Sequence, residues 1–252
     1  MNCFNKDYSS FYDLIYKDKK YTKEILSIKK IIKKYHKKPK NLLEFGCGTG
    51  NHSNLLSKLN LDVLGIDKSP FMLNIAKKKY GKNKKLKFLK SDINKLKIKK
   101  RFDIVSALFH ILSYQIQEEK IEKFFINSHR HLKKNGILIF DFWYKPAVLN
   151  LRPAIKVKFA TDKKYEIYRI THPKWNKSQD IINIGYELLI FNKKNKKAKT
   201  IKEIHRMKYF DLEKIKKYLI TYKFKLLEGL EIISNKKISP NTWGALVVAK
   251  KI

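Results

Sequence analysis

The sequence lacks several features that would narrow its class at once. It has only two cysteines, Cys3 and Cys47, which argues against a disulfide framework and fits a reducing compartment. No run approaches the roughly 18 to 20 apolar residues that a membrane span needs, and the N-terminus lacks the order of a signal peptide. No His, Cys and carboxylate cluster has metal-ligand spacing. We therefore expect a cytoplasmic protein with no metal site and no membrane partner.

Negative charge is also scarce, and the net charge is +36. Such an excess suggests a partner with phosphates, either nucleic acid or an anionic membrane surface. The lysines, however, are spread over nearly every expected helix and loop. Codons for Lys, Asn and Ile are all rich in A and T, so a biased genome also accounts for this composition. The charge alone names no partner.

Apolar runs alternate with amphipathic stretches between residue 42 and about residue 142. The expected strands are residues 42–45, 61–66, 86–89, 102–109 and 136–142, and the expected helices are residues 51–59, 70–80 and 117–132. The second of these helices begins with Ser69 as cap and Pro70 at its first position. This alternation predicts an α/β fold, with a parallel sheet covered by helices on both faces.

Different patterns flank this unit. A helical stripe of apolar residues covers 21–36. Residues 154–172, 179–192 and 200–210 are rich in Val, Ile, Tyr and Phe, and the turn clusters KWNKSQD and NKKNKK interrupt them, as in antiparallel β-structure. Asp211 then caps a helix over 212–223, and strands follow near 225–233 and 243–249. We expect one domain of residues 1–150 and 211–252, with a helical lid at 1–38 and a β-rich substrate-side insertion at 151–210.

A glycine-rich turn follows the first expected strand. Gly46, Gly48 and Gly50 form G-x-G-x-G, whereas a dinucleotide fold would place its third glycine at position 51, which is Asn51. A phosphate-binding P-loop is excluded because no Lys-Ser/Thr pair follows. The turn alone is weak evidence for any particular ligand.

Two acidic residues stand at the tips of the next two strands, where ligands bind in such a sheet. Asp67 suits the hydroxyls of a ribose, and Asp92 with Ile93 suits the amino group and the face of a base. Each aspartate alone is also compatible with an ordinary surface turn. Together with the glycines they predict a nucleoside site.

These stretches resemble the class I S-adenosylmethionine-dependent methyltransferases, in LLEFGCGTG, LGID, KSDI and HLKKNGILIFDF. The resemblance implies a doubly wound, mostly parallel seven-stranded sheet and S-adenosylmethionine as cofactor. It implies that Glu44 supports the turn, that Asp67 holds the ribose, and that Met72 lines the adenosine pocket. The cofactor contacts expected from this resemblance are Glu44, Gly46, Cys47, Gly48, Gly50, Asp67, Lys68, Met72, Asp92, Ile93 and Leu108.

The chain further resembles N-methyltransferases that act on nucleotide-linked deoxysugars and similar small molecules. The matching segments are FYDLIYKDKKY, ALFHILSY, DFWYKP and HRMKYF. One departure is Trp243, in SPNTWGALVV, near the position where those enzymes carry an arginine for the nucleotide diphosphate. A small-molecule acceptor is therefore expected, and a nucleotide-linked sugar stays open.

Methyl transfer chiefly requires alignment and desolvation of the acceptor. An amine must only be unprotonated, whereas an alcohol needs a base. His110 and Tyr114 are the catalytic candidates, and a buried structural histidine is the alternative for His110. Tyr12 and Tyr21 are expected to cover the cofactor as part of a lid, although simple aromatic packing explains them equally well. The substrate-binding candidates are Tyr16, Asp141, Trp143, Tyr144, His205 and Arg206.

Three classes of function are compatible with the sequence. A small-molecule methyltransferase, acting on nitrogen or oxygen, is the main hypothesis. An RNA or DNA methyltransferase is the rival that the charge favours, but the chain has no N/D-P-P-Y stretch after the fourth expected strand and no Pro-Cys pair. A non-catalytic binding protein is the third class. The sequence is compatible with a homodimer.

Overall fold

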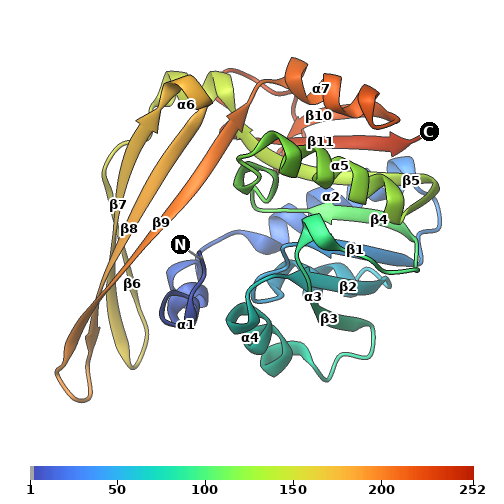
Figure 1. Ribbon diagram of the computed structural model, residues 1–252. Helices are drawn as coiled ribbons and strands as arrows, with labels where there is room; N and C mark the ends of the chain where they lie inside the picture. Colours follow the sequence, from blue (N-terminus) through green and yellow to red (C-terminus); the bar gives the residue numbers. More distant parts are fainter. Residues whose placement is uncertain (1–2) are drawn as a thin grey trace.

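The glycine turn lies at the carboxyl ends of the parallel strands of the central sheet. The computed structural model describes residues 3–252 of the 252-residue chain. Its five parallel strands have the order β3-β2-β1-β4-β5, and β11 and β10 extend the sheet antiparallel beyond β5 (Figure 1). The strands are β1 (Asn41–Phe45), β2 (Asp62–Asp67), β3 (Leu86–Lys90), β4 (Phe102–Ala107), β5 (Leu132–Tyr144), β10 (Phe224–Glu231) and β11 (Gly244–Lys251). The expected doubly wound α/β fold is confirmed.

Helices cover both faces of this sheet because each carries an apolar stripe. The helices are α2 (Tyr21–Tyr35), α3 (Asn51–Ser57), α4 (Pro70–Tyr80), α5 (Glu118–His131) and α7 (Leu212–Thr221). Phe124 of α5 and Ile215 of α7 pack into one face, while Ile28 of α2 and Leu56 of α3 pack into the other. The predicted Ser69 cap is confirmed, since its hydroxyl accepts a bond of 3.3 Å from the backbone N–H of Met72.

A second group of strands is antiparallel. It consists of β6 (Lys156–Thr161), β7 (Tyr165–Asn176), β8 (Ile181–Asn192) and β9 (Ala198–Phe210), and the end of β9 pairs with the end of β5. The prediction that KWNKSQD is entirely a turn is wrong. Because Trp175 and Asn176 pair with β8, β7 continues through them, and the turn is the short helix η3 (Lys177–Gln179). A helix that we did not expect, α6 (Lys145–Leu151), follows β5.

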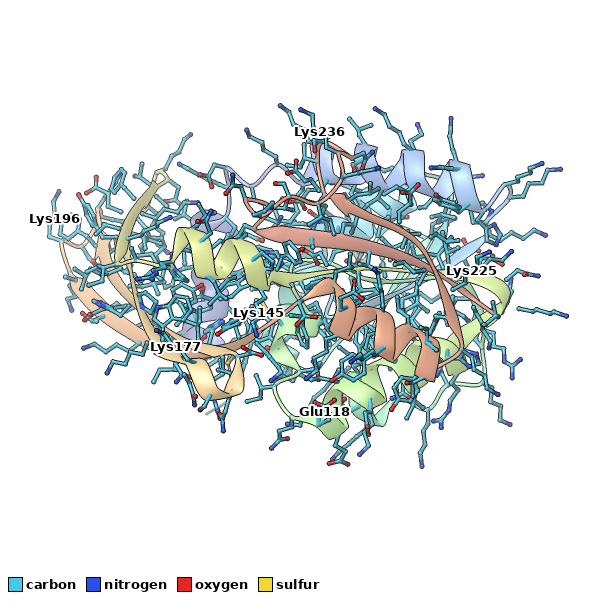
Figure 2. The ribbon with its side chains drawn as sticks, turned by 90° about the horizontal axis from the view of Figure 1, so that it is seen from above. Glu118, Lys145, Lys177, Lys196, Lys225 and Lys236 are labelled. Atoms are coloured by element: carbon cyan, nitrogen blue, oxygen red, sulfur yellow. The ribbon has the colours of Figure 1, made fainter. Side chains whose placement is uncertain are left out.

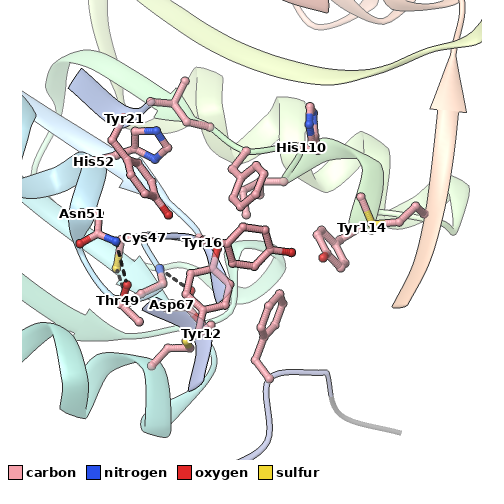
Figure 3. A pocket seen from close by; sticks show the side chains of 18 of the residues that line it. Tyr12, Tyr16, Tyr21, Cys47, Thr49, Asn51, His52, Asp67, His110 and Tyr114 are labelled. Carbon is pink, nitrogen blue, oxygen red and sulfur yellow. Dashed lines mark hydrogen bonds between the residues drawn. The ribbon is translucent and has the colours of Figure 1, made fainter. Parts of the chain in front are cut away.

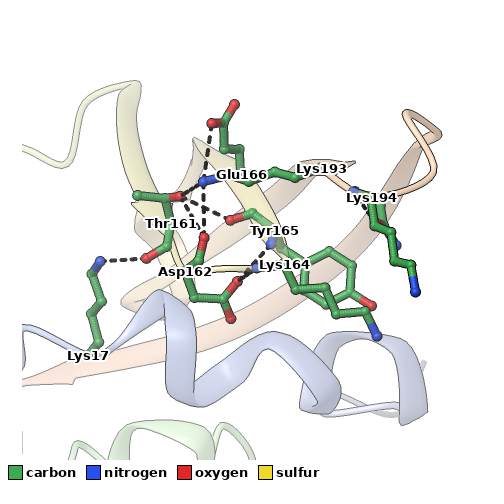
Figure 4. Close-up of polar contacts among 9 residues, drawn as sticks. Lys17, Thr161, Asp162, Lys164, Tyr165, Glu166, Lys193 and Lys194 are labelled. Carbon is green, nitrogen blue, oxygen red and sulfur yellow. Dashed lines mark hydrogen bonds and ion pairs between the residues drawn. The ribbon is translucent and has the colours of Figure 1, made fainter.

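Helix α1 (Lys6–Ile15) lies between the antiparallel strands and the parallel sheet (Figure 1). Asp13 accepts a bond of 2.7 Å from the Thr49 hydroxyl in the glycine turn. Lys17 donates a bond of 2.7 Å to the carbonyl of Thr161, at the β6–β7 turn that Figure 4 shows. The N-terminal segment therefore connects the two parts of the molecule. Within residues 3–252, no helix is long and apolar enough to cross a membrane.

Candidate active site

The glycine turn offers its backbone to a ligand. Gly46, Gly48 and Gly50 all have positive φ, at 65°, 54° and 79°. A Cβ on Gly46 would lie 2.3 Å from Cδ1 of Ile111, so a side chain there would require a rearrangement. A Cβ on Gly48 would meet nothing within 4 Å and would project into open space beside the turn. The turn therefore forms a cradle that fits a bound cofactor.

Asp67, at the end of β2, faces this turn. One carboxylate oxygen accepts a bond of 2.9 Å from the Gly48 N–H, and the other accepts one of 2.8 Å from the Ser69 N–H. Burial raises the pKa of Asp67, although these two bonds oppose the shift. Each oxygen keeps acceptor capacity for a ligand hydroxyl.

Glu44 and Gly50 lie behind the turn and line neither cavity. Glu44 is buried, accepts a bond from the Ser53 hydroxyl, and has its pKa raised to about 7 by burial. The expected direct contact of Glu44 and Gly50 with the cofactor therefore does not agree with this geometry. They support the turn and the start of α3 from behind.

A cavity of about 530 Å³ opens on the Asp92 side of the turn. Asp92 caps the short helix η1 (Ile93–Lys95) by accepting a bond of 2.8 Å from the Asn94 N–H. Ile93 and Lys68 line the same cavity, as expected for the adenosine end of the cofactor. Asn94 and Gln115, which we did not predict, complete its polar wall and lie 3.1 Å apart between side-chain nitrogen and oxygen.

A second cavity of about 270 Å³ continues from the first past Gly46 and Asp67. The predicted residues that line it include Tyr12, Tyr16, Tyr21, Cys47, Leu108, His110, Tyr114 and Trp143. In Figure 3 the hydroxyls of Tyr16 and Tyr114 face each other across this cavity. Met72 also lines it, rather than the cavity beside Asp92, because α4 packs against α1 here. The cavity is a largely aromatic chamber next to the glycine turn.

His110 and Asp141 form a pair at the wall of this chamber. Nδ1 of His110 lies 3.1 Å from the Asp141 carboxylate, which also accepts a bond of 2.9 Å from the His110 N–H. Phe109 and His110 both have positive φ, at 66° and 65°, a conformation that costs energy for non-glycine residues. Burial opposes ionisation of Asp141, but His110 and Lys19 lower its pKa overall. The carboxylate is therefore an anion held against the imidazole.

Two expectations for the end of β5 are wrong. Asp141 does not border the chamber, because it is buried beneath His110. Tyr144 packs against the central core instead, since its strand position points away from the chamber. Trp143, between them in the sequence, does line the chamber, and its ring lies 6.3 Å from that of His110.

Tyr114, at the end of η2 (Leu112–Tyr114), begins a chain of polar contacts that runs through His205 to Glu203. Its hydroxyl lies 2.8 Å from Nδ1 of His205, and Nε2 of His205 lies 2.8 Å from a carboxylate oxygen of Glu203. His205 is buried and lines neither cavity, so its predicted direct contact with substrate is wrong. Arg206 points from the opposite face of β9 and lines the larger cavity.

Glu203 also fixes the N-terminal segment. Its two oxygens accept bonds of 3.1 Å and 2.8 Å from the N–H groups of Phe4 and Asn5. Burial raises the pKa of Tyr114 well above its usual value, so this hydroxyl stays protonated and serves as a donor. We did not predict Glu203, although its alternation with His205 along β9 places both on one face.

Several chamber residues have no counterpart in the prediction. These residues are Phe4, Thr49, Asn51, His52, Phe109, Ile111, Arg169, Tyr186 and Met207. Trp243, which the sequence analysis named only as a departure from an expected arginine, also lines the chamber. Tyr186 and Met207 come from the antiparallel strands, whose approach to the glycine turn no local pattern reveals. Within residues 3–252, no group of three or more His, Cys, Asp or Glu residues is arranged to hold a metal ion.

Comparisons with known proteins agree with this fold. Residues 42–136 match the methyltransferase domain family. A putative methyltransferase of Geobacillus is 25% identical over 98% of this chain and 99% of its own length. An S-adenosylmethionine-dependent methyltransferase from Clostridium acetobutylicum superposes with a TM-score of 0.81, at 24% identity over 99% of both chains. The sugar N-methyltransferase KedS8 from Streptoalloteichus superposes with a TM-score of 0.82, at 18% identity over 100% of this chain and 95% of its own.

A shorter match links the chain to an aminosugar enzyme. The dTDP-3-amino-3,4,6-trideoxy-α-D-glucopyranose N,N-dimethyltransferase of Streptomyces venezuelae is 24% identical over 57% of this chain and 60% of its own length. The domain match, the fold and the glycine cradle together define an enzyme of the methyltransferase class. Residues 42–136 form a methyltransferase domain, and the chain as a whole has the fold of S-adenosylmethionine-dependent methyltransferases.

Proposed function

We propose that the enzyme methylates the amino group of a small molecule, such as an amino sugar. The observation that carries this proposal is the His110–Asp141 pair, which lies at the wall of an aromatic chamber of about 270 Å³ beside the glycine turn. Such a volume suits a small acceptor. Similarity to sugar N-methyltransferases supports the same class of substrate.

Each part of the site has a role in this proposal. S-adenosylmethionine, when bound, supplies a methyl group activated on a sulfonium. Asp67 accepts hydrogen bonds from its ribose, and Asp92 with Ile93 frames its adenine. Tyr12 and Tyr21 cover the glycine turn and exclude water. Residues 151–210 form the substrate-side insertion in this account.

His110 supplies the proton chemistry. An amine becomes a nucleophile only after it loses its extra proton, and a positioned imidazole accepts such a proton efficiently. The Asp141 anion, 3.1 Å from Nδ1, orients the ring and stabilises the imidazolium that forms. The hydroxyl of Tyr114 stays protonated and donates to Nδ1 of His205, so its oxygen is left to accept a hydrogen bond from the acceptor and orient it.

Trp243 supports an acceptor without a nucleotide. Its ring lies 5.3 Å from that of Trp143 at the chamber wall, near the position where the resemblance leads us to expect an arginine. An apolar ring offers a diphosphate no charge. We therefore propose a free amino sugar or a similar metabolite amine.

The distribution of lysine supports a small molecule over nucleic acid. Lysine side chains project around the whole outline of the molecule in Figure 2, with Lys196, Lys225 and Lys236 in separate parts of it. A binding footprint would concentrate charge along one face. If RNA were the acceptor, a salt-sensitive affinity would appear in a filter-binding assay at physiological ionic strength.

A methyl-transfer screen tests the proposal. The purified enzyme is incubated with S-adenosylmethionine and, separately, with amino sugars, other metabolite amines, matched alcohols and bulk RNA. We expect amines to gain the mass of one or two methyl groups. Transfer to alcohols or RNA, with none to amines, would contradict the proposal.

A further inference from the structure

Arg169 brings an uncompensated positive charge to the wall of the chamber. It lies on the inner face of β7, and its side chain is one of the groups that line the 270 Å³ cavity. The ion pairs that β7 forms join Glu166 to Lys193 and His172 to Glu187. Its own Nε is buried and has no hydrogen-bond partner among residues 3–252. The side chain as a whole is half-buried, and withdrawing a cation from water is costly unless an anion accompanies it.

Aromatic rings hold this guanidinium in place. Its central carbon lies 5.3 Å from the ring centre of Tyr16 and 5.1 Å from that of Tyr186. Such contacts stabilise a cation but supply no counter-ion, and they leave Nε without an acceptor. Tyr8 packs at 6.0 Å on the same Tyr186 ring, and its buried hydroxyl has no partner within the described residues either.

The buried carboxylate of Glu203 lies on this face but is already occupied. Glu203 pairs with Tyr186 across β8 and β9, but His205 and two backbone N–H groups of the N-terminal segment take its oxygens. It is therefore not available as the counter-ion of Arg169. An anionic ligand in the chamber would compensate this charge.

The position of Arg169 favours the acceptor over the cofactor. It belongs to the antiparallel strands, whereas the cofactor cradle is built from the ends of β1, β2 and β3. Tyr16 lies between Arg169 and the part of the chamber that His110 lines. Its ring is 5.3 Å from that of Phe109, the neighbour of His110 in the sequence. An acceptor that spans this distance would present its amine to His110 and its other end to Arg169.

We infer that Arg169 binds an oxyanion, a carboxylate or a phosphate, carried by the methyl acceptor. This inference rests on the proposed function and makes the substrate an amine that also bears an acidic group. A planar guanidinium suits both kinds of oxyanion through paired hydrogen bonds. Burial raises the pKa of Tyr186, so its hydroxyl stays protonated and can donate to the same anion.

Three matched probes separate the sources of the anion. Binding of glucosamine, glucosamine 6-phosphate and glucosaminic acid is measured by calorimetry in the presence of S-adenosylhomocysteine, and methylation of each is measured by mass shift. We expect at least one of the two acidic probes to bind at least tenfold more tightly than glucosamine. The better of these two identifies a phosphate or a carboxylate as the preferred anion.

Two variants test the role of Arg169. Arg169→Met removes the cation, and Arg130→Met makes the same change at an exposed position on α5. We expect Arg169→Met to abolish the preference for the acidic probes, mostly through KM, and Arg130→Met to retain it. The affinity for S-adenosylhomocysteine should stay within about twofold in both.

The outcomes distinguish this inference from the proposed function. Methylation of glucosamine as efficiently as of its acidic analogues, with no effect of Arg169→Met, would overturn the inference and leave the proposed function standing. A tenfold loss of cofactor affinity in Arg169→Met would assign the arginine to the cofactor carboxylate and also overturn it. Failure of every amine, acidic or neutral, would count against both.

Discussion

Nδ1 of His110 lies 3.1 Å from a carboxylate oxygen of Asp141, although the two residues belong to different strand ends. The same carboxylate accepts a bond of 2.9 Å from the His110 N–H. One buried anion therefore accepts a hydrogen bond from the backbone of the proposed base and lies at ion-pair distance from its ring. The positive φ of His110 shows that the chain adopts a costly conformation to present this ring.

Asp141→Asn should slow methyl transfer to an amine by about 100-fold or more near neutral pH, since general-base catalysis has this order of magnitude. The affinity for S-adenosylhomocysteine should not change. The loss should shrink at high pH, where solvent deprotonates the amine without help. Steady-state kinetics from pH 6 to about pH 10 check this, with Asp62→Asn, at an exposed position on β2, as control. An equal loss at every pH would indicate a purely structural role.

Asp67→Ala should weaken cofactor binding by roughly 1 to 3 kcal/mol, the order for losing a partner of buried hydroxyls. The substitution also removes the acceptor of the Gly48 N–H, so the turn should become less ordered. Calorimetry with S-adenosylhomocysteine measures the change, and Asp62→Ala on the same strand is the matched control. Unchanged affinity in Asp67→Ala would refute its assignment to the ribose.

Glu44 should make the protein less stable as the pH rises. Burial raises its pKa to about 7 in the folded state, above the usual value near 4.5. Its contribution to stability is therefore fully present below about pH 4.5 and is lost as the pH rises through about 7. The total loss is about 3 kcal/mol at most, from the difference between the two pKa values.

Glu44→Gln should flatten this dependence. Urea unfolding of the cofactor-free protein at pH 5 and pH 8 gives the two free energies of unfolding for each protein. We expect the difference between the two pH values to be smaller in the variant than in the parent. An unchanged difference would mean that another group is responsible.

Glu203→Gln should loosen the N-terminal segment, because the neutral amide accepts the N–H groups of Phe4 and Asn5 less strongly than the anion. Cys3 provides the readout. Burial and Glu203 both raise the pKa of its thiol, so the variant should react faster with a thiol reagent.

The controls for this experiment are in the chain. Cys47 is buried, with its pKa raised well above the usual value by burial, and a Cys3→Ser variant measures its background reaction. Glu187→Gln changes a carboxylate on β8 that pairs with Lys202 instead. Equal labelling rates in Glu203→Gln and the parent protein would show that this carboxylate does not hold the segment.

The cofactor half of the site could be predicted from the sequence because its residues follow strand tips at regular spacing. Asp67 and Asp92 are two such residues. Parallel pairing places the carboxyl ends of successive strands next to one another, which brings these aspartates to the same side of the sheet. The acceptor half could not be predicted in this way. Arg169 reaches the chamber, and Glu203 lies behind Tyr114 and His205, only because β9 joins the end of β5 and turns the antiparallel strands toward the glycine turn. That arrangement depends on long-range pairing, which no local pattern records.

The strand ends were predicted less well for the same reason. KWNKSQD has the composition of a turn, yet Trp175 and Asn176 complete the ladder with β8. Tyr144 follows a predicted pocket residue, Trp143, and therefore points to the opposite face of β5. Asp141 lies on the same face as Trp143, but His110 covers it. Sequence position placed these side chains near the site but did not show which way they point.

The most direct test of the central claim is a mass measurement on products of the purified enzyme with S-adenosylmethionine and a panel of small amines. The account predicts that an amine gains one or two methyl groups while S-adenosylhomocysteine accumulates in equal amount, and that Asp67→Ala lowers both. Accumulation of neither product with any small amine, while RNA becomes methylated, would contradict it.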